Sequence, residues 1–161
     1  MSVFTDGLKA KIDGFLTRYE TKRSAILPVL HAIQDDHGWI KPEHLDELEA
    51  SYGLSKVHVK EVISFYDIYR DVPTRKFVVR YCDSITCRQF GSTAAMARVS
   101  AHIERLDKDL GKDGPFELQA FACLGKCDGA PVMLVNKDRH EHATADKIDE
   151  VLAKYAPLKP L

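Results

Sequence analysis

Lys76-Phe-Val-Val-Arg-Tyr-Cys-Asp-Ser-Ile-Thr-Cys87 is the stretch of this 161-residue chain that decides its fold. Its first half is rich in β-branched and aromatic residues, which predicts a strand that delivers Cys82 to its end. A second predicted strand, Phe116–Phe121, leads into Cys123-Leu-Gly-Lys-Cys127. These two pairs contain all four cysteines of the chain, and we expect both pairs in loops. A strand that runs into a ligand loop is a rigid support, so the pattern predicts a metal centre held at two neighbouring strand ends.

Several other uses of paired cysteines compete with that interpretation. Structural zinc sites with four cysteines also use two pairs, but in short knuckles whose usual spacing is stretched here. Disulfides suit an even cysteine count, yet the chain is large enough to build a core without them and no secretory leader is expected. A dithiol redox motif needs C-x-x-C, which is absent. Metal binding remains the favoured interpretation, with zinc as the main competitor.

The type of centre follows from the separation of the pairs. Four cysteine thiolates complete the ligand set of a [2Fe–2S] or a [4Fe–4S] cluster. A [4Fe–4S] site in small ferredoxins comes from a dense C-x₂-C-x₂-C run, whereas two separated pairs can each chelate one iron of a binuclear cluster. A Rieske centre needs two histidine ligands, and neither His140 nor His142 lies beside a cysteine. The sequence therefore favours [2Fe–2S], with these metal ligands: Cys82, Cys87, Cys123 and Cys127.

The residues around both pairs resemble a known family. The segments Tyr81–Cys87 and Ala122–Pro131 closely resemble the thioredoxin-like [2Fe–2S] ferredoxin subunit of bacterial respiratory complex I, the E-subunit family of NADH-quinone oxidoreductase. The resemblance extends to Ala25–His31, Asp36–Ile40 and Val62–Tyr66, so it spans most of the chain. In that family all four motif cysteines bind the cluster, which carries over here without a departure from the pattern. Related subunits serve NAD-linked formate dehydrogenases and NAD-reducing hydrogenases.

The resemblance implies an electron-transfer subunit of an NADH dehydrogenase complex. A partner flavoprotein subunit takes hydride from NADH onto FMN, and the [2Fe–2S] cluster exchanges single electrons with that flavin, off the main electron path. Other peripheral-arm subunits are further expected partners. No G-x-G-x-x-G fingerprint occurs, so FMN and NADH are expected on the partner. The chain is expected to be an oxidoreductase as a subunit, with no catalytic residue and no complete active site of its own. The alternatives are a homologous formate dehydrogenase or hydrogenase subunit and, in a different class, a zinc-pinned structural adaptor.

Charge and hydropathy exclude other classes. Lys and Arg number 23 against 24 Asp and Glu, so the net charge near −1 provides no basic field for nucleic acid. No apolar run approaches the roughly 20 residues that a membrane-spanning helix needs. The expected location is cytoplasmic, in the peripheral arm of a membrane-associated complex.

Residues 1–71 are predicted to form an N-terminal four-helix bundle. Apolar residues recur at helical intervals along two faces, the first with Leu8, Ile12, Phe15 and Tyr19 and the second with Leu27, Leu30 and Ile33. Ser24 and Ser55 are candidate N-caps, and Pro42 suits a helix start. Gly38 and Gly53 are expected to end helices. The fourth helix carries Val59, Val62, Ile63 and Tyr66.

Residues 72–161 are predicted to form the thioredoxin-like [2Fe–2S] domain of an α/β (α+β) protein. A helix with Met96, Val99, Ile103 and Leu106 lies between the two strands, and a turn at 111–115 precedes the second. Residues 131–142 are predicted to form a hairpin. Thr144 is expected to cap a last helix, whose apolar stripe is Ile148, Val151, Leu152 and Tyr155.

Residues beside the cysteines are candidates for tuning the cluster. Arg88 and Lys126 would raise its reduction potential if they faced it, and solvated side chains remain the alternative. Their effect is opposed by equally many acids, Asp83 and Asp128. Two glycines, Gly125 and Gly129, are predicted to let backbone N–H groups approach the sulfurs.

The remaining chemistry-bearing residues are assigned structural or docking roles. Five helical histidines are interpreted as packed or solvated, namely His31, His37, His44, His58 and His102. The helical half is predicted to dock the flavoprotein through Trp39 and the Phe65–Tyr66 pair. A core-filling role for these aromatics remains the alternative.

Overall fold

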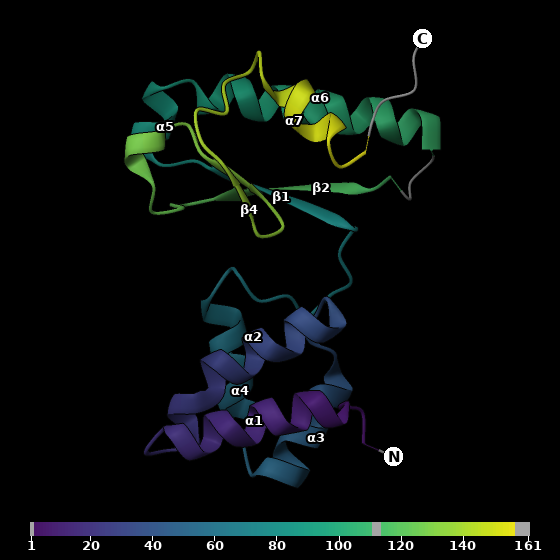
Figure 1. Cartoon of the computed structure of the whole chain (residues 1–161), viewed down its shortest axis with the longest axis vertical. Helices are drawn as coiled ribbons and strands as arrows, with labels where there is room; N and C mark the ends of the chain where they lie inside the picture. Colours follow the sequence, from purple (N-terminus) through teal and green to yellow (C-terminus); the bar gives the residue numbers. More distant parts are fainter. Residues whose placement is uncertain (1, 111–113, 157–161) are drawn as a thin grey trace. The chain divides into compact units, whose positions relative to one another are not determined.

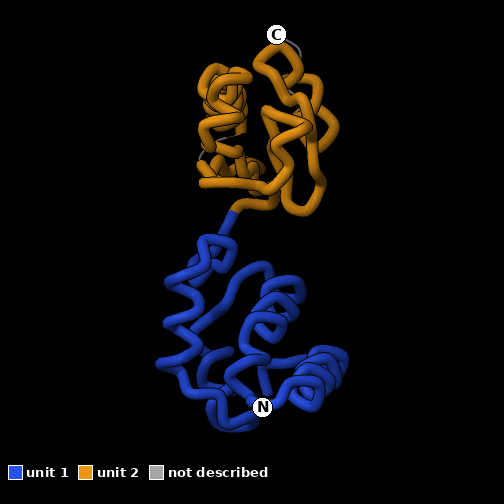
Figure 2. Tube along the Cα trace, turned by 90° about the vertical axis from the view of Figure 1, so that its left-hand side faces the viewer, with its two compact units in different colours: residues 1–74 blue, residues 75–161 orange. Residues whose placement is uncertain are grey.

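The computed structural model describes residues 2–110 and 114–156, in a mixed α/β fold. The chain divides into two compact units, residues 1–74 and 75–161 (Figure 2). The predicted division after residue 71 into a helical domain and a cluster domain stays a prediction. Three residues of the predicted turn at 111–115 lie outside the described residues.

In the described part of the first unit, the regular elements are all helices (Figure 1). Its elements are α1 (Asp6–Arg18), the 3₁₀ turn η1 (Arg23–Ala25), α2 (Ile26–His37), α3 (Pro42–Tyr52) and α4 (Lys56–Phe65). All four α-helices contribute side chains to one apolar core, among them Ile12, Leu30, Leu48 and Val59. The packing class, a four-helix bundle, stays a prediction.

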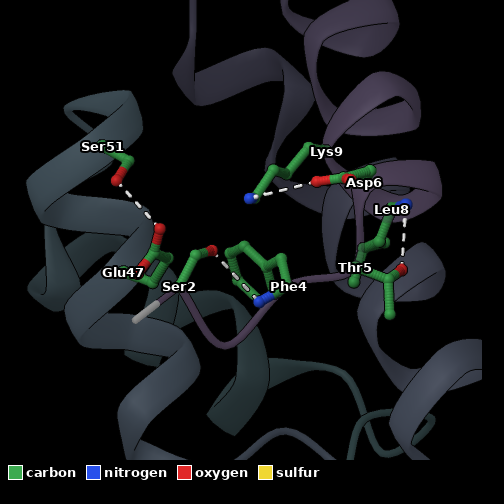
Figure 3. A network of polar contacts seen from close by, with 8 residues as sticks. All are labelled: Ser2, Phe4, Thr5, Asp6, Leu8, Lys9, Glu47 and Ser51. Atoms are coloured by element: carbon green, nitrogen blue, oxygen red, sulfur yellow. Dashed lines mark hydrogen bonds and ion pairs between the residues drawn. The ribbon is translucent and has the colours of Figure 1, made fainter.

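Local sequence signals mark the first and last residues of several of these helices. The Thr5 hydroxyl accepts the Leu8 N–H at 3.2 Å and caps α1, as Figure 3 shows. Gly38 and Gly53 end α2 and α3 with positive φ values of 81° and 65°, which confirms both predicted stops. Pro42 is the first residue of α3, as predicted.

The predicted cap at Ser24 is wrong, and the cap at Ser55 is confirmed in its position but not in a side-chain bond. Ser24 lies inside η1, and α2 begins at Ile26 after Ala25. Ser55 occupies the N-cap position of α4 but its side chain makes no capping bond. The Glu49 carboxylate accepts the Lys56 N–H at 3.2 Å instead, so a neighbouring helix satisfies this end.

Three residues that helical periodicity put on apolar helix faces are exposed. Tyr19 and Tyr66 lie just beyond the last turns of α1 and α4, where the helical periodicity that placed them inward has ended. Leu27 is exposed because the buried stripe of α2 begins one residue earlier, at Ile26, and continues through Val29, Leu30 and Ile33.

The second unit is built on a four-stranded sheet in the order β2-β1-β3-β4. The strands are β1 (Phe77–Cys82), β2 (Phe116–Phe121), β3 (Met133–Val135) and β4 (Asp138–His140). β1 and β2 are parallel, while β3 pairs antiparallel with both β1 and β4. The predicted strands and hairpin are therefore confirmed, and α6 (Ser92–Leu110) and α7 (Ile148–Ala153) cover one face of the sheet (Figure 1).

Two features of this unit differ from prediction. A short helix, α5 (Ile85–Gln89), contains Cys87, which was expected in a loop. The last helix begins at Ile148 rather than after Thr144. A turn at residues 145–147 separates Thr144 from the helix, and the Thr144 hydroxyl instead lowers the pKa of the Asp146 carboxyl group.

The buried His102 has a partner that sequence reasoning missed. Its Nδ1 lies 2.9 Å from the Asp149 carboxylate, which also accepts a hydrogen bond from Arg98. Hydrogen bonds from both side chains lower the Asp149 pKa against the opposing effect of burial. The three residues therefore tie α7 to α6.

In the described part of the chain, no helix is both long enough and apolar enough to cross a bilayer.

His44 generates a prediction for the stability of the helical unit. Its side chain is 1% exposed, and its Nδ1 accepts the Lys41 N–H at 3.1 Å. Burial, with a smaller contribution from His37, lowers the pKa of His44 from 6.5 to about 4. Below pH 6.5 His44 binds a proton more tightly in the unfolded chain than in the folded one, and this favours unfolding. The stability that neutral, buried His44 contributes is therefore complete above pH 6.5 and is lost as the pH falls toward 4.

We expect His44→Asn to flatten this pH dependence, because the amide oxygen can accept the same N–H without titrating. Between pH 7.5 and 4.5 the wild type should lose about 2.5 kcal/mol more unfolding free energy than the variant. Urea unfolding followed by circular dichroism at both pH values measures the difference. Equal losses in the two proteins would contradict the assignment.

Candidate metal centre

The pairing of β1 with β2 brings the two cysteine pairs to one edge of the sheet. Cys82 is the last residue of β1 and lies opposite Phe121, the last residue of β2. Cys123 follows two residues later. The pairing continues past the strand, because the Asp83 N–H donates to the Phe121 carbonyl at 2.8 Å. Since parallel strands leave their sheet at the same edge, both loops begin side by side.

The second cysteine of each pair lies in a short helical turn. Cys87 is in the middle of α5, at the end of the sheet where β1 finishes (Figure 1). Cys127 begins the 3₁₀ turn η2 (Cys127–Gly129). All four cysteines are free thiols. Local helical turns therefore hold Cys87 and Cys127, while the sheet holds Cys82.

The four thiols interact across the two pairs. The Cys87 thiol of the same pair and the Cys123 thiol of the other pair both lower the pKa of Cys82. Cys87 in turn interacts electrostatically with Cys127. Each cysteine of the first pair is thus close to one of the second, Cys82 to Cys123 and Cys87 to Cys127. The structure therefore brings the predicted ligands together as one group.

The two buried thiols of this group differ in their pKa. Burial alone would raise the pKa of Cys82, but backbone N–H donors from Ser84 and Leu124 and the Cys87 and Cys123 thiols lower it overall. Burial raises the pKa of Cys87 to about 11, and the neighbouring Cys82 adds to the shift.

The sequence predicted some, but not all, of the backbone N–H groups that donate to the cysteine sulfurs. Gly125 has a φ of +71° and its N–H donates to the Cys123 Sγ at 3.4 Å, as predicted. The prediction for Gly129 is wrong, because its N–H donates to the Lys126 carbonyl at 3.2 Å in the turn of η2. The missed donors to sulfur are the backbone groups of Ser84, Leu124 and Val132. Any residue supplies such a donor, so the sequence carries no signal for them.

The charged residues beside the cysteines form two local ion pairs. The Arg88 guanidinium donates to both Asp83 carboxylate oxygens, at 2.7 and 2.6 Å, and this lowers the Asp83 pKa. Lys126 pairs with Asp128, which lowers the pKa of that carboxyl group. Each predicted cation is thus engaged by one of the predicted acids. Any effect on a reduction potential stays a prediction.

The site is buried on one side and exposed on the other. Cys82 and Cys87 are buried against Ala130 and the half-buried Leu124, whereas Cys123 and Cys127 are exposed. Two large apolar side chains on and beside α5 are also exposed, Ile85 at 74% and Phe90 at 61%. The short helix that holds Cys87 therefore carries exposed apolar surface, and the second cysteine pair exposes sulfur.

The donor set fits a binuclear iron–sulfur cluster. Four cysteines in two interacting pairs, with N–H groups directed at the sulfurs, are the ligands and outer contacts that such a cluster uses. Over residues 2–110 and 114–156, no three His, Cys, Asp or Glu side chains are arranged for one single metal ion.

Comparison with known proteins assigns the family. The model of the thioredoxin-like [2Fe–2S] ferredoxin family matches residues 12–156. The chain belongs to this family. The E subunit of the NADH-quinone oxidoreductase of Aquifex aeolicus is similar, 32% identical over 94% of this chain and 95% of the relative. Subunit 2 of the Thermus thermophilus NADH-quinone oxidoreductase is 33% identical over 83% of this chain and 75% of that relative.

A solved structure shares the fold of this chain. A chain of a NAD⁺-reducing [NiFe]-hydrogenase, crystallised in the air-oxidised state, superposes with a TM-score of 0.63 at 22% identity. The match covers 78% of this chain but 22% of the hydrogenase chain, so this protein spans about a fifth of that neighbour. At this identity the likeness supports the fold alone.

The geometry of Gly125 predicts a loss of cluster retention in Gly125→Ala. No atom lies near enough to clash with an added methyl group, so the cost comes from the left-handed backbone, about 1–2 kcal/mol for an L-residue. Relaxing that strain moves the N–H away from the Cys123 sulfur. We expect the visible absorbance of the purified variant to bleach several-fold faster in excess chelator.

Gly7→Ala is the matched control, because Gly7 lies in α1 with equally open space around it. Its bleaching rate should equal that of the wild type. If Gly125→Ala also bleached at the wild-type rate, the Gly125 donor would have no part in holding the centre.

Proposed function

We propose that this chain is an electron-transfer subunit of an NADH dehydrogenase complex. In this proposal one [2Fe–2S] cluster, bound by Cys82, Cys87, Cys123 and Cys127, supplies one-electron exchange with FMN on a partner flavoprotein subunit. The observation that carries the proposal is the convergence of two separated cysteine pairs into one interacting group of thiols. Family membership and relatives named as NADH-quinone oxidoreductase subunits support it.

The protein's own contribution is to hold negative charge at sulfur. Two thiolates per iron leave the ligand set anionic, and gaining an electron adds a further negative charge. Backbone N–H groups of Ser84, Leu124 and Gly125 face sulfur atoms and stabilise that charge without titrating. The nearby Arg88 and Lys126 are neutralised by Asp83 and Asp128. Backbone dipoles are therefore the main local donors in this proposal.

The exposed side of the site is where the proposal puts the flavoprotein. Cys123 and Cys127 are exposed, and so are Ile85 and Phe90 on and beside the helix that holds Cys87. A partner face that covers these side chains would bury apolar surface and exclude water from the sulfurs. FMN and NADH belong to that partner in the proposal, and other peripheral-arm subunits complete the complex on the cytoplasmic side of its membrane. A role as a temporary electron store, off the main path, follows from family resemblance.

Two kinds of alternative stand beside this proposal, another host complex and a protein of a different class. The hydrogenase neighbour keeps open an NAD-linked hydrogenase or formate dehydrogenase as the complex. A zinc-pinned adaptor is the rival from another class, although no contact of the four thiols favours it over iron.

We expect the anaerobically purified chain to be red-brown and to contain two irons and no stoichiometric zinc. On reduction, a paramagnetic signal should integrate to about one spin per chain, as expected of a single binuclear cluster. Cys123→Ser should lose most of the iron and absorbance, with the helical signal of the first unit unchanged. A colourless protein with stoichiometric zinc would refute the proposal.

Partner contact needs a separate readout within this experiment. With NADH and the purified flavoprotein, the reduced-cluster signal should form within the turnover time of the complex. The double substitution Ile85→Ser/Phe90→Ser should slow that step about tenfold or more while leaving the isolated cluster signal intact. Leu110→Ser is the control, since Leu110 is an exposed apolar residue at the far end of α6. Equal rates in all three proteins would remove this face from the partner interface.

A further inference from the structure

The chain just beyond β4 lies directly against the loop that carries the second cysteine pair. The His142 N–H donates to the Gly129 carbonyl at 2.8 Å. The Ala143 N–H donates in the same way to the Pro131 carbonyl at 2.9 Å. Gly129 closes the 3₁₀ turn η2, which begins at Cys127. The end of the hairpin therefore fixes the backbone two residues beyond a predicted ligand.

Glu141 occupies the space that a side chain at position 129 would need. The Cβ atom of an alanine at this position would lie 2.5 Å from the Glu141 Oε2 and 2.8 Å from its Cγ. Both distances are far shorter than a van der Waals contact. Gly129 is buried, and its φ is not among the positive values of the described glycines. Close packing of Glu141, rather than a left-handed backbone, therefore explains why a glycine fits this turn.

The Glu141 carboxylate connects the cysteine loop to β4. Its Oε2 lies 3.8 Å from the Nζ of Lys126, the residue before Cys127, and its Oε1 lies 3.1 Å from the Nε of Arg139 in β4. Lys126 also pairs with Asp128. The formal charges of these four side chains cancel, and the Glu141 and Lys126 side chains are only 32% and 28% exposed. Removing the Glu141 charge would therefore leave a net positive charge beside the second cysteine pair.

We propose that Glu141 is a positioning residue for the second cysteine pair. Its side chain holds the turn at Cys127 by packing on Gly129 and by pairing with Lys126, and its charge offsets one cation near the sulfurs. The effect on a cluster rests on the proposed function, whereas the contacts belong to the chain itself. Two separable consequences follow. Loss of the packing loosens the turn and shortens cluster retention, and loss of the charge alone makes reduction easier.

Substitutions at Glu141 separate these two effects. Glu141→Gln keeps the size of the side chain over Gly129 and removes its charge. We expect its cluster retention to stay close to that of the wild type, while its midpoint reduction potential becomes more positive. Glu141→Ala removes both features, so the positive shift should be joined by several-fold faster bleaching of the visible absorbance in excess chelator. A redox titration followed by the paramagnetic signal of the reduced cluster measures the potential.

The matched controls are Glu150→Gln and Glu150→Ala. Glu150 is exposed on α7 and pairs with Lys154 at 3.5 Å, so these variants remove one negative charge and one ion pair from the same unit. Both should keep the wild-type potential and bleaching rate. A positive shift as large as that of Glu141→Gln would show that the total charge of the unit, rather than the placement of Glu141, sets the potential, and it would overturn the assignment.

A double-mutant cycle tests the contact with Gly129 itself. In the wild-type chain, Gly129→Ala pushes against the Glu141 side chain and should speed bleaching several-fold. In the Glu141→Ala background that space is free, so the same methyl group should change the rate little. Equal acceleration in both backgrounds would show that the two residues act independently and would contradict the proposed contact.

Backbone hydrogen exchange of the full-length chain gives a readout that does not depend on which metal is bound. Glu141→Ala should raise exchange of the amides of residues 126–130 several-fold, and Glu150→Ala should not. Iron and zinc are measured in the same samples. A wild-type chain without iron would refute the proposed function, and the exchange rates would still decide the role of Glu141. Wild-type exchange together with wild-type bleaching in Glu141→Ala would overturn that role.

Discussion

Parallel pairing of β1 with β2 is the constraint on which the cluster site depends. The six-residue register from Phe77 opposite Phe116 to Cys82 opposite Phe121 leaves no freedom for where the two loops begin. A slip of one residue would turn Cys82 to the opposite face of the sheet. The bond from the Asp83 N–H to the Phe121 carbonyl carries the same register one step into the loops. The backbone hydrogen bonds between β1 and β2 therefore fix the relative position of the two cysteine loops, which the loop side chains could not do alone.

Much of this site could be predicted from the sequence, because its strongest signals are local. The strands before Cys82 and Cys123 follow from β-branched and aromatic runs, and the ligand set follows from the cysteine spacing. The remainder depends on tertiary contacts. Helix α5 is too short to show a period, and backbone donors such as the Leu124 N–H carry no residue signature. Whether Gly129 turns its N–H to sulfur or to the Lys126 carbonyl is decided by the turn it closes.

The helical unit shows the same division between local and tertiary information. Glycine stops at 38 and 53 were predictable, because left-handed backbone favours glycine. The solvent exposure of individual apolar residues could not be predicted in this way. Leu27 and Ile26 are adjacent and equally apolar, and the packing of neighbouring helices decides which one faces the core. The exposure of Phe65, at the end of α4, likewise depends on packing that periodicity alone does not contain, and its core-filling alternative is wrong.

Iron K-edge X-ray absorption on the purified, oxidised chain tests the central claim most directly. The account predicts that every iron has sulfur neighbours alone and that a short iron–iron scattering path is present, as in a binuclear cluster held by four cysteines. Replacing Cys82 with serine should introduce an oxygen neighbour or remove the iron. A spectrum without an iron–iron path, or a chain that takes up zinc in place of iron, would contradict the account.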